Sequence, residues 1–504
     1  MSWKVIWQAL KNSDMRKRVG AVLGMLLVFR VMAHIPIPLS DPETLKQVLQ
    51  NLFTNSSSSL LSFIDTLSGG ALANFSIMLI GLGPYINASI ILQLLTKAIP
   101  KLEEMNKEGE YGRKKINQYT RMLTFPLAII QSIGAIYLVR QQAQQVGGIG
   151  DITANSSMLQ WVLMIGALTG GAMILMWLGE LITEQGIGNG ISLLITVGIV
   201  STLPQTIGSI VSSIVDKGSK FTLLGKTLPI NKQALIYGAL IGTVTIIATI
   251  FIVKLNEASR KITINYAKRV QGNRAYGGVT TTLPVKLITA GVVPIIFAVA
   301  FLSVPSFLGQ IMSSSSSIRM QEIGANLALW FQTPSQQTFA QDGFIPYIYP
   351  VVYFLLVFVF TFFYTSITFN AKEIAENLQK QGGFIEGVRS GSETEKHLGK
   401  IVNRLTLFGA TALGFLALMP IIGQVLLKSD NISIGGTSVL ILVSVALETL
   451  RSIESRALMV TYDQYEQPDF FYDSSDNPEL AASGGRRLKL GGRFLRRKSR
   501  NKNT

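Results

Sequence analysis

Residues 68–97 constrain the fold of this chain more than any other stretch. No charged residue occurs between Asn74 and Thr96, and an apolar run of this length is typical of a membrane span, which needs about 20 residues. Gly83-Pro84 interrupts the run in its middle, and lipid offers no partner for the backbone groups that a proline frees. We therefore expect the segment to face protein or water on one side, as the wall of a passage through a membrane.

The composition of the 504-residue chain agrees with a membrane bundle. Hydrophobic residues make up 48% of the chain and charged residues only 15%, whereas soluble proteins carry about 25% charged residues. The chain has no cysteine and two histidines, which excludes disulfides and thiol chemistry and leaves too little histidine for a histidine-rich metal site. We expect no metal, no cofactor and no enzymatic activity, because no nucleophile is paired with a base.

Ten apolar segments predict an all-α membrane protein with ten transmembrane helices. An even number of spans places both termini on one side, and the basic residues near both ends make that side cytoplasmic by the positive-inside rule. The same rule assigns loops 98–121, 255–285 and 371–403 to the cytoplasm, while segment 212–233 disagrees because it carries lysines yet should be external. The predicted spans are 19–38, 76–97, 122–142, 158–179, 188–211, 234–254, 286–312, 346–370, 404–427 and 435–460.

Residues 63–74 are too short and too polar to span a bilayer. As a helix they would reach about 18 Å, against about 30 Å of hydrocarbon, and they include Asp65 and Asn74. They form either an external loop or a re-entrant piece that enters a protein-lined cavity. Gly69-Gly70 would serve as its hinge.

Acidic side chains are scarce within the predicted spans. Proton- or ion-coupled transporters place Asp, Glu or His inside the bilayer, but here Glu180, Glu184 and Glu448 lie towards the cytoplasmic ends of their spans. Arg30 and His34 fall inside the first span, where we expect snorkelling or pairing near the outer interface. The energy for any transport should therefore come from a partner.

Several runs of residues resemble the signatures of the SecY family, the channel subunits of bacterial protein translocases. Residues 81–95 (GLGPYINASIILQLL) resemble the second span of the family, and residues 177–192 (WLGELITEQGIGNGIS) resemble its next signature. The resemblance extends in register over roughly residues 1–465. Shorter similar runs occur at 265–269, 283–286, 290–294, 369–370 and 376–378.

The resemblance implies two five-helix halves around a central pore. The halves would comprise residues 19–211 and 234–462, joined by the external loop 212–233. Residues 1–18 would be a cytoplasmic segment, and residues 463–504 a disordered, basic cytoplasmic tail near anionic lipid headgroups, with nucleic-acid binding as an alternative. The protein would be a multi-pass protein of the plasma membrane with both termini cytoplasmic, or of a thylakoid membrane.

The resemblance also implies a ring of aliphatic side chains at the waist of the pore, which excludes water and ions by dewetting. Two pairs of ring positions are four residues apart, so we expect each pair to share one helix face. Without the resemblance, these side chains would be interpreted as ordinary core or lipid-facing aliphatics. The ring positions are Leu82, Ile86, Ile187, Ile191, Ile296 and Leu416.

The half-polar segment 63–74 would then be a plug, a short helix that seals the outer side of the ring. The second, third, seventh and eighth spans would form a lateral gate. Asn87 and Gln131 would hold the closed gate together by interhelical hydrogen bonds, or would bond within their own helices instead. The plug residues are Phe63, Ile64, Asp65, Thr66, Leu67, Ser68, Gly69, Gly70, Ala71 and Leu72.

By the same resemblance, the partners are SecE-like and SecG-like small membrane subunits, the SecA motor ATPase, the ribosome, signal peptides, nascent polypeptides and anionic lipids. The basic loops would receive the ribosome or the motor, although their charges also fit membrane topology alone. Arg389 is followed by Ser390-Gly391, where the family commonly has Pro-Gly. The docking residues are Lys268, Arg269, Arg274 and Arg389.

The implied function is that of a protein-conducting channel, which passes unfolded secretory polypeptides across the membrane and releases hydrophobic segments sideways into lipid. Two alternatives remain open. One is a secondary transporter of a small solute, a class that also uses interrupted helices. The other is a structural or insertase subunit that has no pore of its own.

Overall fold

A computed structural model describes most of the chain. The described residues are 13–37, 68–72, 74–145, 157–214, 221–223, 226–228, 232–266, 269–271, 274–276, 278, 280–313, 317–331, 334, 339, 343–427 and 431–464. Residues 17–452 form one compact unit, and residues 1–16 with 453–504 form another. Of this second unit the structure describes only the ends of two helices, α2 (Ser13–Met32) and α17 (Asn431–Gln464). The remaining described elements belong to residues 17–452.

The N-terminal part of the chain is helical, and each of the first five predicted spans overlaps one long helix. A short additional helix, α6 (Pro100–Lys107), lies in loop 98–121. The five long helices are α2 (Ser13–Met32), α5 (Gly83–Ala98), α7 (Glu110–Gln145), α8 (Met158–Glu184) and α9 (Gly190–Ile214).

The C-terminal part follows the same pattern, with one helix for each of the other five predicted spans. Among the described residues, two further helices occur outside the spans: α12 (Ile318–Phe331), between the seventh and eighth predicted spans, and α15 (Ala371–Lys380). The five long helices are α10 (Lys232–Glu257), α11 (Val293–Ser313), α14 (Ile345–Thr368), α16 (Ser392–Leu427) and α17 (Asn431–Gln464).

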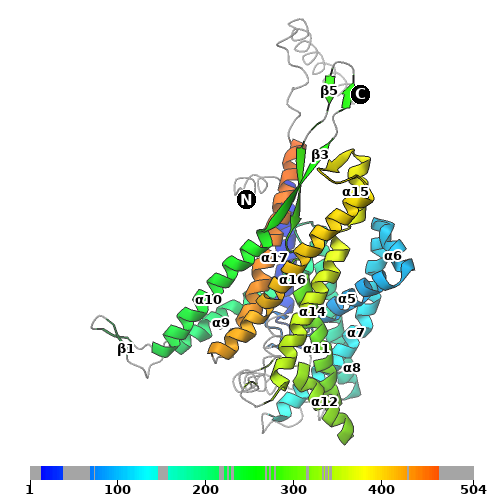
Figure 1. The fold of residues 1–504 in the computed structure, drawn as a ribbon. Helices are drawn as coiled ribbons and strands as arrows, with labels where there is room; N and C mark the ends of the chain where they lie inside the picture. The colour runs from blue at the N-terminus through cyan, green and yellow to red at the C-terminus, as the bar shows by residue number, and fades with distance from the viewer. Residues whose placement is uncertain are drawn as a thin grey trace, which may run out of the picture. The chain divides into compact units, whose positions relative to one another are not determined.

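The helices of residues 17–452 pack in a chain of neighbours. Helix α7 contacts α5 and α8, and α8 contacts α9. Helix α11 contacts α12 and α14, and it also contacts α5 and α7 from the N-terminal part. In Figure 1, α14 and α16 run side by side, in agreement with their extensive contact.

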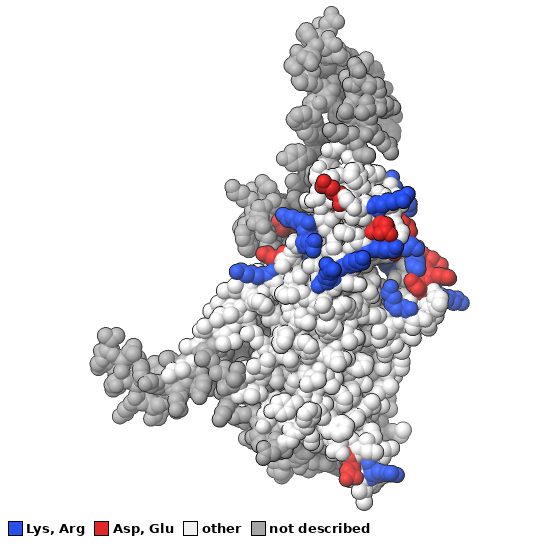
Figure 2. All heavy atoms as spheres, viewed as in Figure 1, with Lys and Arg blue, Asp and Glu red and all other residues white. Residues whose placement is uncertain are grey.

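Apolar helices long enough to cross a membrane occur among the described residues. Three meet the requirements of length and composition: Met158–Glu184, Ile345–Lys380 and Ser392–Gly423. Figure 2 shows that charged side chains on the viewed face gather around β3, α15 and α6, while most of the length of α14 and α16 carries none. This distribution suits a protein whose helical part lies in lipid.

The expectation of an all-α protein is wrong in detail, because the predicted loops contain strands. Strand β3 (Ser259–Tyr266) pairs antiparallel with β6 (Thr280–Lys286) and β7 (Gly383–Ile385), in the order β6-β3-β7. Ile262 and Ile264 alternate with exposed residues along β3, which is the period of a strand with one buried face. The two remaining pairs are the hairpins β1 (Phe221–Leu223) with β2 (Lys226–Leu228), and β4 (Arg269–Gln271) with β5 (Arg274–Tyr276).

This three-stranded sheet joins the two basic loops that the sequence presented as separate. Strand β7, from loop 371–403, pairs with β3, from loop 255–285, so that Asn265 lies opposite Phe384. Apolar side chains from both loops and from the start of α16 form one small core beneath the sheet. Its buried members are Ile262, Val285, Ile385, Leu398, Ile401 and Val402.

The second predicted span also needs a correction, because its Gly-Pro pair begins a helix rather than interrupting one. Helix α5 starts at Gly83 with Pro84 in its first turn, where the missing N–H of proline has no intrahelical partner to lose. Residues 77–82 are turns, yet Met78 and Leu79 are buried. The helix has 16 residues, which reach about 24 Å and fall short of the hydrocarbon thickness.

Candidate functional site

The first two ring positions lie where the turns of residues 77–82 enter α5. Leu82 is buried and is the N-cap of the helix, and its carbonyl accepts a hydrogen bond from the Ile86 N–H at 3.0 Å. Ile86 is half-buried. The two residues are therefore one helical turn apart, at the end of α5 that adjoins the segment 68–82.

For the second pair, the expectation of a shared helix face is wrong. Ile187 is buried but precedes α9, between Gly186 at φ 71° and Gly188 at φ 110°. These left-handed glycines break the helical path. Helix α9 begins only at Gly190, and half-buried Ile191 is in its first turn.

The loop that carries Ile187 is held firmly between α8 and α9. The Asn189 side-chain oxygen accepts from the Ile191 N–H at 3.0 Å, which is an N-cap bond. The Thr183 hydroxyl accepts from the Gly190 N–H at 2.9 Å and donates to the Gly179 carbonyl at 2.8 Å. A Cβ on Gly190 would lie 1.9 Å from the Gly179 oxygen, so the two backbones are in direct contact.

The last two ring positions come from the C-terminal helices. Ile296 is half-buried in the first turn of α11, and Leu416 is buried in α16. All six ring side chains are thus buried or half-buried, and they come from elements in both parts of the chain.

The predicted plug is described only in part. Phe63, Ile64, Asp65, Thr66 and Leu67 lie outside the described residues. Ser68, Ala71 and Leu72 are buried, and Gly69 and Gly70 have φ values of 73° and 83°. The described end of the segment is therefore packed inside the protein in a left-handed turn.

Arg30 of α2 reaches this turn, which the sequence did not indicate. Its Nη1 donates to the Gly69 carbonyl at 2.6 Å and to the Ser201 hydroxyl at 2.9 Å. The Nδ1 of exposed His34 lies 2.8 Å from the Arg30 carbonyl. The only advance signal was the rarity of an arginine inside a predicted span.

The two polar residues predicted at the gate lie on neighbouring helices of the N-terminal part. Asn87 is buried in α5, and Gln131 is half-buried in α7. A Cβ built on Gly83 would lie 3.2 Å from the Gln131 Oε1, so Gln131 points at the start of α5. A bond missed by the sequence joins Ser132 of α7 to Thr169 of α8, whose hydroxyl oxygens are 3.1 Å apart.

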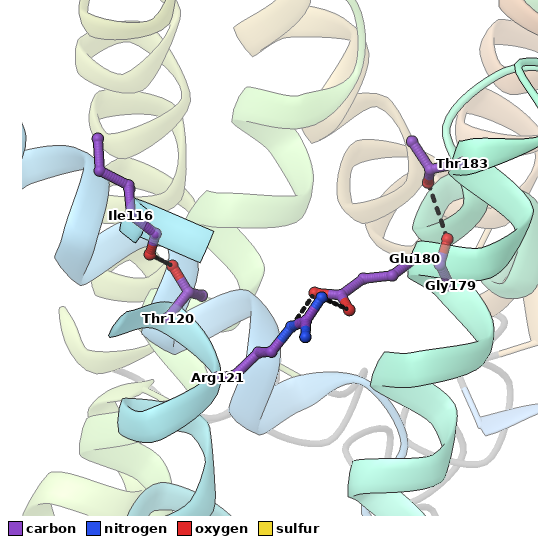
Figure 3. Close-up of polar contacts among 6 residues, drawn as sticks. All are labelled: Ile116, Thr120, Arg121, Gly179, Glu180 and Thr183. Atoms are coloured by element: carbon purple, nitrogen blue, oxygen red, sulfur yellow. Dashed lines mark hydrogen bonds and ion pairs between the residues drawn. The ribbon is translucent and has the colours of Figure 1, made fainter. Parts of the chain in front are cut away.

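A second missed contact is the ion pair between Arg121 of α7 and Glu180 of α8 (Figure 3). The Arg121 Nε donates to Oε1 at 3.0 Å, and Nη2 lies 2.6 Å from Oε2. Two-point contact of this kind fixes the relative position of the two helices.

The amino-acid sequence matches one known protein family. The SecY family model matches residues 76–450. The chain is 39% identical over 463 residues to the protein translocase subunit SecY of Corynebacterium glutamicum, covering 91% of this chain and 98% of that protein. It is 38% identical over 461 residues to the SecY of Streptomyces scabiei, with the same coverage.

The chain belongs to the SecY family. Three solved structures share the fold at 18% identity. One is described as a protein conducting channel (TM-score 0.57, covering 90% of this chain and 94% of that one), and another concerns the SecY plug domain (TM-score 0.55, 90% and 94%). The third is Sec61 in the canine ribosome-channel complex (TM-score 0.55, 89% and 94%).

The SecY match includes all six ring positions and both predicted gate residues, but not Arg30 or the plug residues 63–72. The run at residues 81–95 that resembles a SecY signature forms the turn before α5 and most of α5, which contain Leu82 and Ile86. The second such run, at residues 177–192, is the α8–α9 junction, where the glycines allow the close backbone approach of Gly190 to Gly179.

Three of the four docking residues predicted from the SecY resemblance are among the described residues, in the two basic loops that contribute strands to the three-stranded sheet. Lys268 is outside the described residues, while Arg269 and Arg274 belong to the paired strands β4 and β5. Arg389 is exposed in the turn before α16, and its carbonyl accepts from the Thr394 hydroxyl at 2.9 Å. Gly391, which follows the unusual Ser390, has a φ of 98°.

One titratable group of this sheet, Lys286, has a perturbed pKa. Burial lowers the pKa of Lys286, at the end of β6, and nearby Arg451 lowers it further, while Glu448 partly opposes the change. Among the described residues, no cluster of three or more histidine or carboxylate side chains could hold a metal ion.

Proposed function

We propose that this chain is a protein-conducting channel, which passes unfolded secretory polypeptides across a membrane and releases hydrophobic segments sideways into lipid. Membership of the SecY family carries the proposal. The six aliphatic ring positions support it, because elements from both parts of the chain contribute them and none is exposed. The comparisons lend no support to a solute transporter, the alternative that the sequence left open.

The ring would act as a seal that any polypeptide can pass. A narrow constriction of aliphatic side chains excludes water and ions by dewetting. It offers no hydrogen-bond partner to a translocating backbone, so no sequence is retained by it. Leu82 and Ile86 would line one side of the constriction, Ile187 and Ile191 another, and Ile296 and Leu416 the remainder.

The gate would open between α5 and α7 on one side and α11 and α14 on the other. Contacts of α11 with both α5 and α7 support this placement, because they cross from one part of the chain to the other. A signal sequence carries an apolar core of 7–15 residues. At a few tenths of a kcal/mol per leucine, such a core prefers lipid by several kcal/mol, so it would leave through an open gate.

The larger architecture follows from the same family membership. Residues 19–211 and 234–462 would form two five-helix halves around the pore, linked by 212–233, and residues 63–74 would plug its outer side. A SecY structure described as showing that the plug domain stabilises the closed state and maintains a membrane seal supports this assignment. Both termini would lie in the cytoplasm of a plasma-membrane protein.

The partners would dock on the cytoplasmic sheet and its hairpin. The structural likeness to Sec61 in a ribosome-channel complex supports ribosome binding. Arg269, Arg274 and Arg389 would contribute positive charge, which favours RNA phosphates and acidic protein surfaces. SecE-like and SecG-like subunits and the SecA motor complete the proposed set.

Crosslinking of a stalled chain tests the function directly. The protein has no cysteine, so Ile86→Cys or Ile191→Cys gives a single reactive thiol in the full-length protein. A secretory polypeptide with its own cysteine, arrested during translocation into reconstituted vesicles, should form a disulfide with either variant. A cysteine at exposed Ile247 of α10 is the matched control. Equal crosslinking at all three positions would contradict a central passage.

A further inference from the structure

The turn at residues 68–77 is attached to the rest of the protein at two places. At its far end, the Ile37 N–H donates to the Phe75 carbonyl at 3.0 Å and the Ile77 N–H donates to the Ile35 carbonyl at 3.1 Å. At its near end, the Gly69 carbonyl accepts the bond from Arg30. The two attachments differ in kind. Backbone bonds hold the far end, together with the Ser76 hydroxyl, which donates to the Met32 carbonyl at 2.9 Å, whereas side chains hold the near end.

The near attachment is a compact polar cluster that contains three residues from three separate segments. Arg30 Nη1 lies 2.6 Å from the Gly69 oxygen and 2.9 Å from the Ser201 hydroxyl. The Ser201 hydroxyl lies 3.3 Å from the same Gly69 oxygen and 2.6 Å from the Gly198 carbonyl. A charge-assisted bond to a carbonyl is about twice as strong as a neutral one.

Close packing accompanies these bonds. A Cβ built on Gly69 would lie 2.9 Å from the Gly198 Cα and 3.3 Å from Arg30 Nη1. Nothing lies within 4 Å of the equivalent Cβ on Gly70, although both glycines have left-handed φ values. Of the two glycines, Gly69 is the one that packs against α9, and only a residue without a side chain fits there.

We propose that Arg30 is a positioning residue that latches the turn at residues 68–72 against α9 and so holds the channel shut. The latch is reversible for a physical reason. When the Gly69 carbonyl leaves, Arg30 keeps its bond to Ser201, so the half-buried charge is not left without a partner. Residues 75–77 stay bound to 35–37, so the segment swings about this end rather than detaching. The proposal rests on the proposed function, in which this segment is part of the plug.

Hydrogen exchange of the full-length protein in vesicles tests the latch. Arg30→Gln should raise exchange at residues 68–72 about tenfold, because a hydrogen bond to a charged group is lost. Exchange in the β3–β6 sheet should stay unchanged, which distinguishes local release from general destabilisation. Ser201→Ala should have a smaller local effect, since the arginine keeps its bond to Gly69. Unchanged exchange at 68–72 in Arg30→Gln would overturn the latch.

Two controls keep the test decisive. Arg319→Gln removes an exposed arginine from α12 and should change nothing at residues 68–72. Gly69→Ala and Gly70→Ala both place an alanine at a left-handed φ, which is similarly strained in the two variants. Only the Cβ at position 69 would clash with Gly198 of α9, so exchange should rise more in Gly69→Ala. Equal effects of the two alanines would count against the latch even if Arg30→Gln failed to fold.

Ion conductance separates the latch from the proposed function. Without a translocating chain, Arg30→Gln vesicles should leak ions several-fold faster than wild type, and Arg30→Lys, which keeps the charge, should leak less than Arg30→Gln. Translocation of a secretory polypeptide by the wild-type protein is measured separately. If that fails, the channel function fails; if translocation succeeds while Arg30→Gln neither leaks nor exchanges faster, only the latch is wrong.

Discussion

Two groups of neighbouring helices differ in the contacts that join them: α7 with α8, and α11 with α14 and α16. The contrast does not extend to whole halves of the chain, because Tyr137 and Trp161 form an aromatic pair between α7 and α8 and Asn256 of α10 donates to the Ser444 hydroxyl of α17 at 3.1 Å. Among the described residues, α7 and α8 are joined by the Arg121–Glu180 ion pair and the Ser132–Thr169 hydrogen bond. Helices α11, α14 and α16 are instead joined by aromatic rings, such as Phe297 with Phe360 (centroids 6.1 Å apart, edge-on). Phe354 with Phe415 (5.5 Å) is a second such pair.

The difference matters because packing and polar bonds, rather than hydrophobic burial, hold helices together in lipid. Hydrogen bonds are directional and break when helices shift, whereas edge-on aromatic pairs tolerate a range of geometries with ring centroids about 4.5–7 Å apart. We infer that α7 and α8 form a fixed N-terminal wall and that α11 and α14 can slide.

The largest effect is expected for Gly190→Ala in the N-terminal wall. Its new Cβ would meet the Gly179 carbonyl at 1.9 Å, and backbone cannot move aside as a side chain can. Overpacking of this kind costs about 3 kcal/mol, so thermal unfolding in detergent should show a clear loss of stability. Gly208→Ala in the same helix meets nothing within 4 Å and should not destabilise. A matching loss in both variants would show that the contact is unimportant.

Glu180→Gln should have the next largest effect. It leaves Arg121 without its carboxylate between α7 and α8, at a cost of about 2 kcal/mol, because Arg121 is 47% exposed and partly solvated by water. The control is Glu103→Gln, whose partner Lys107 is 68% exposed; an exposed pair of this type contributes little. A double-mutant cycle with Arg121→Gln measures the coupling, and a coupling near zero would argue against a polar wall.

Phe354→Leu probes the aromatic contacts of the C-terminal helices. The substitution keeps an apolar side chain but removes the edge-on pair with Phe415, worth about 1 kcal/mol beyond burial. We expect a modest loss of thermal stability with translocation rates preserved. Phe362→Leu, which removes a different aromatic pair within α14, serves as the comparison. A loss larger than that of Glu180→Gln would reverse the proposed assignment of wall and sliding helices.

Ser132→Ala should have the smallest effect of the four. It removes the hydrogen bond to Thr169, and interhelical bonds of this type average about 0.6 kcal/mol in membrane proteins. The Ser132 hydroxyl also donates to the Ala128 carbonyl within its own helix, so part of its bonding is local. Thr124→Ala, whose bond is described only within α7, is the matched control. A stability difference between the two isolates the interhelical share.

Much of the helical framework could be predicted from the chain alone. A long run without charge has to form a helix in lipid, because only a helix satisfies its backbone polar groups within the segment. Each of the ten predicted spans accordingly overlaps a helix. The family could also be predicted, because its signatures at 81–95 and 177–192 contain residues that the backbone conformation requires. Pro84 lies in the first turn of α5, and Gly186 and Gly188 have positive φ values. Family membership was confirmed over residues 76–450.

The sequence pattern failed where long-range contacts decided the conformation. Helical spacing suggested that Ile187 and Ile191 share a face, but Gly186 and Gly188 adopt left-handed conformations, and a positive φ cannot be read from a pattern of apolar residues. The addition of β7 to the sheet was missed because β3 pairs with it about 120 residues away in the chain, whereas the β3–β6 pair is local to loop 255–285. A pairing at that separation leaves no local signal.

From the sequence, long runs without charge indicated a helical membrane protein, because lipid requires every backbone polar group to bond within its own helix. The two glycine-rich signatures indicated the SecY family. Only the tertiary structure decided that Arg30 binds the Gly69 carbonyl, that Arg121 pairs with Glu180, and that two distant loops share one sheet. Each of these contacts joins residues far apart in the chain, and their partners are selected by the packing of the helices rather than by any neighbouring residue.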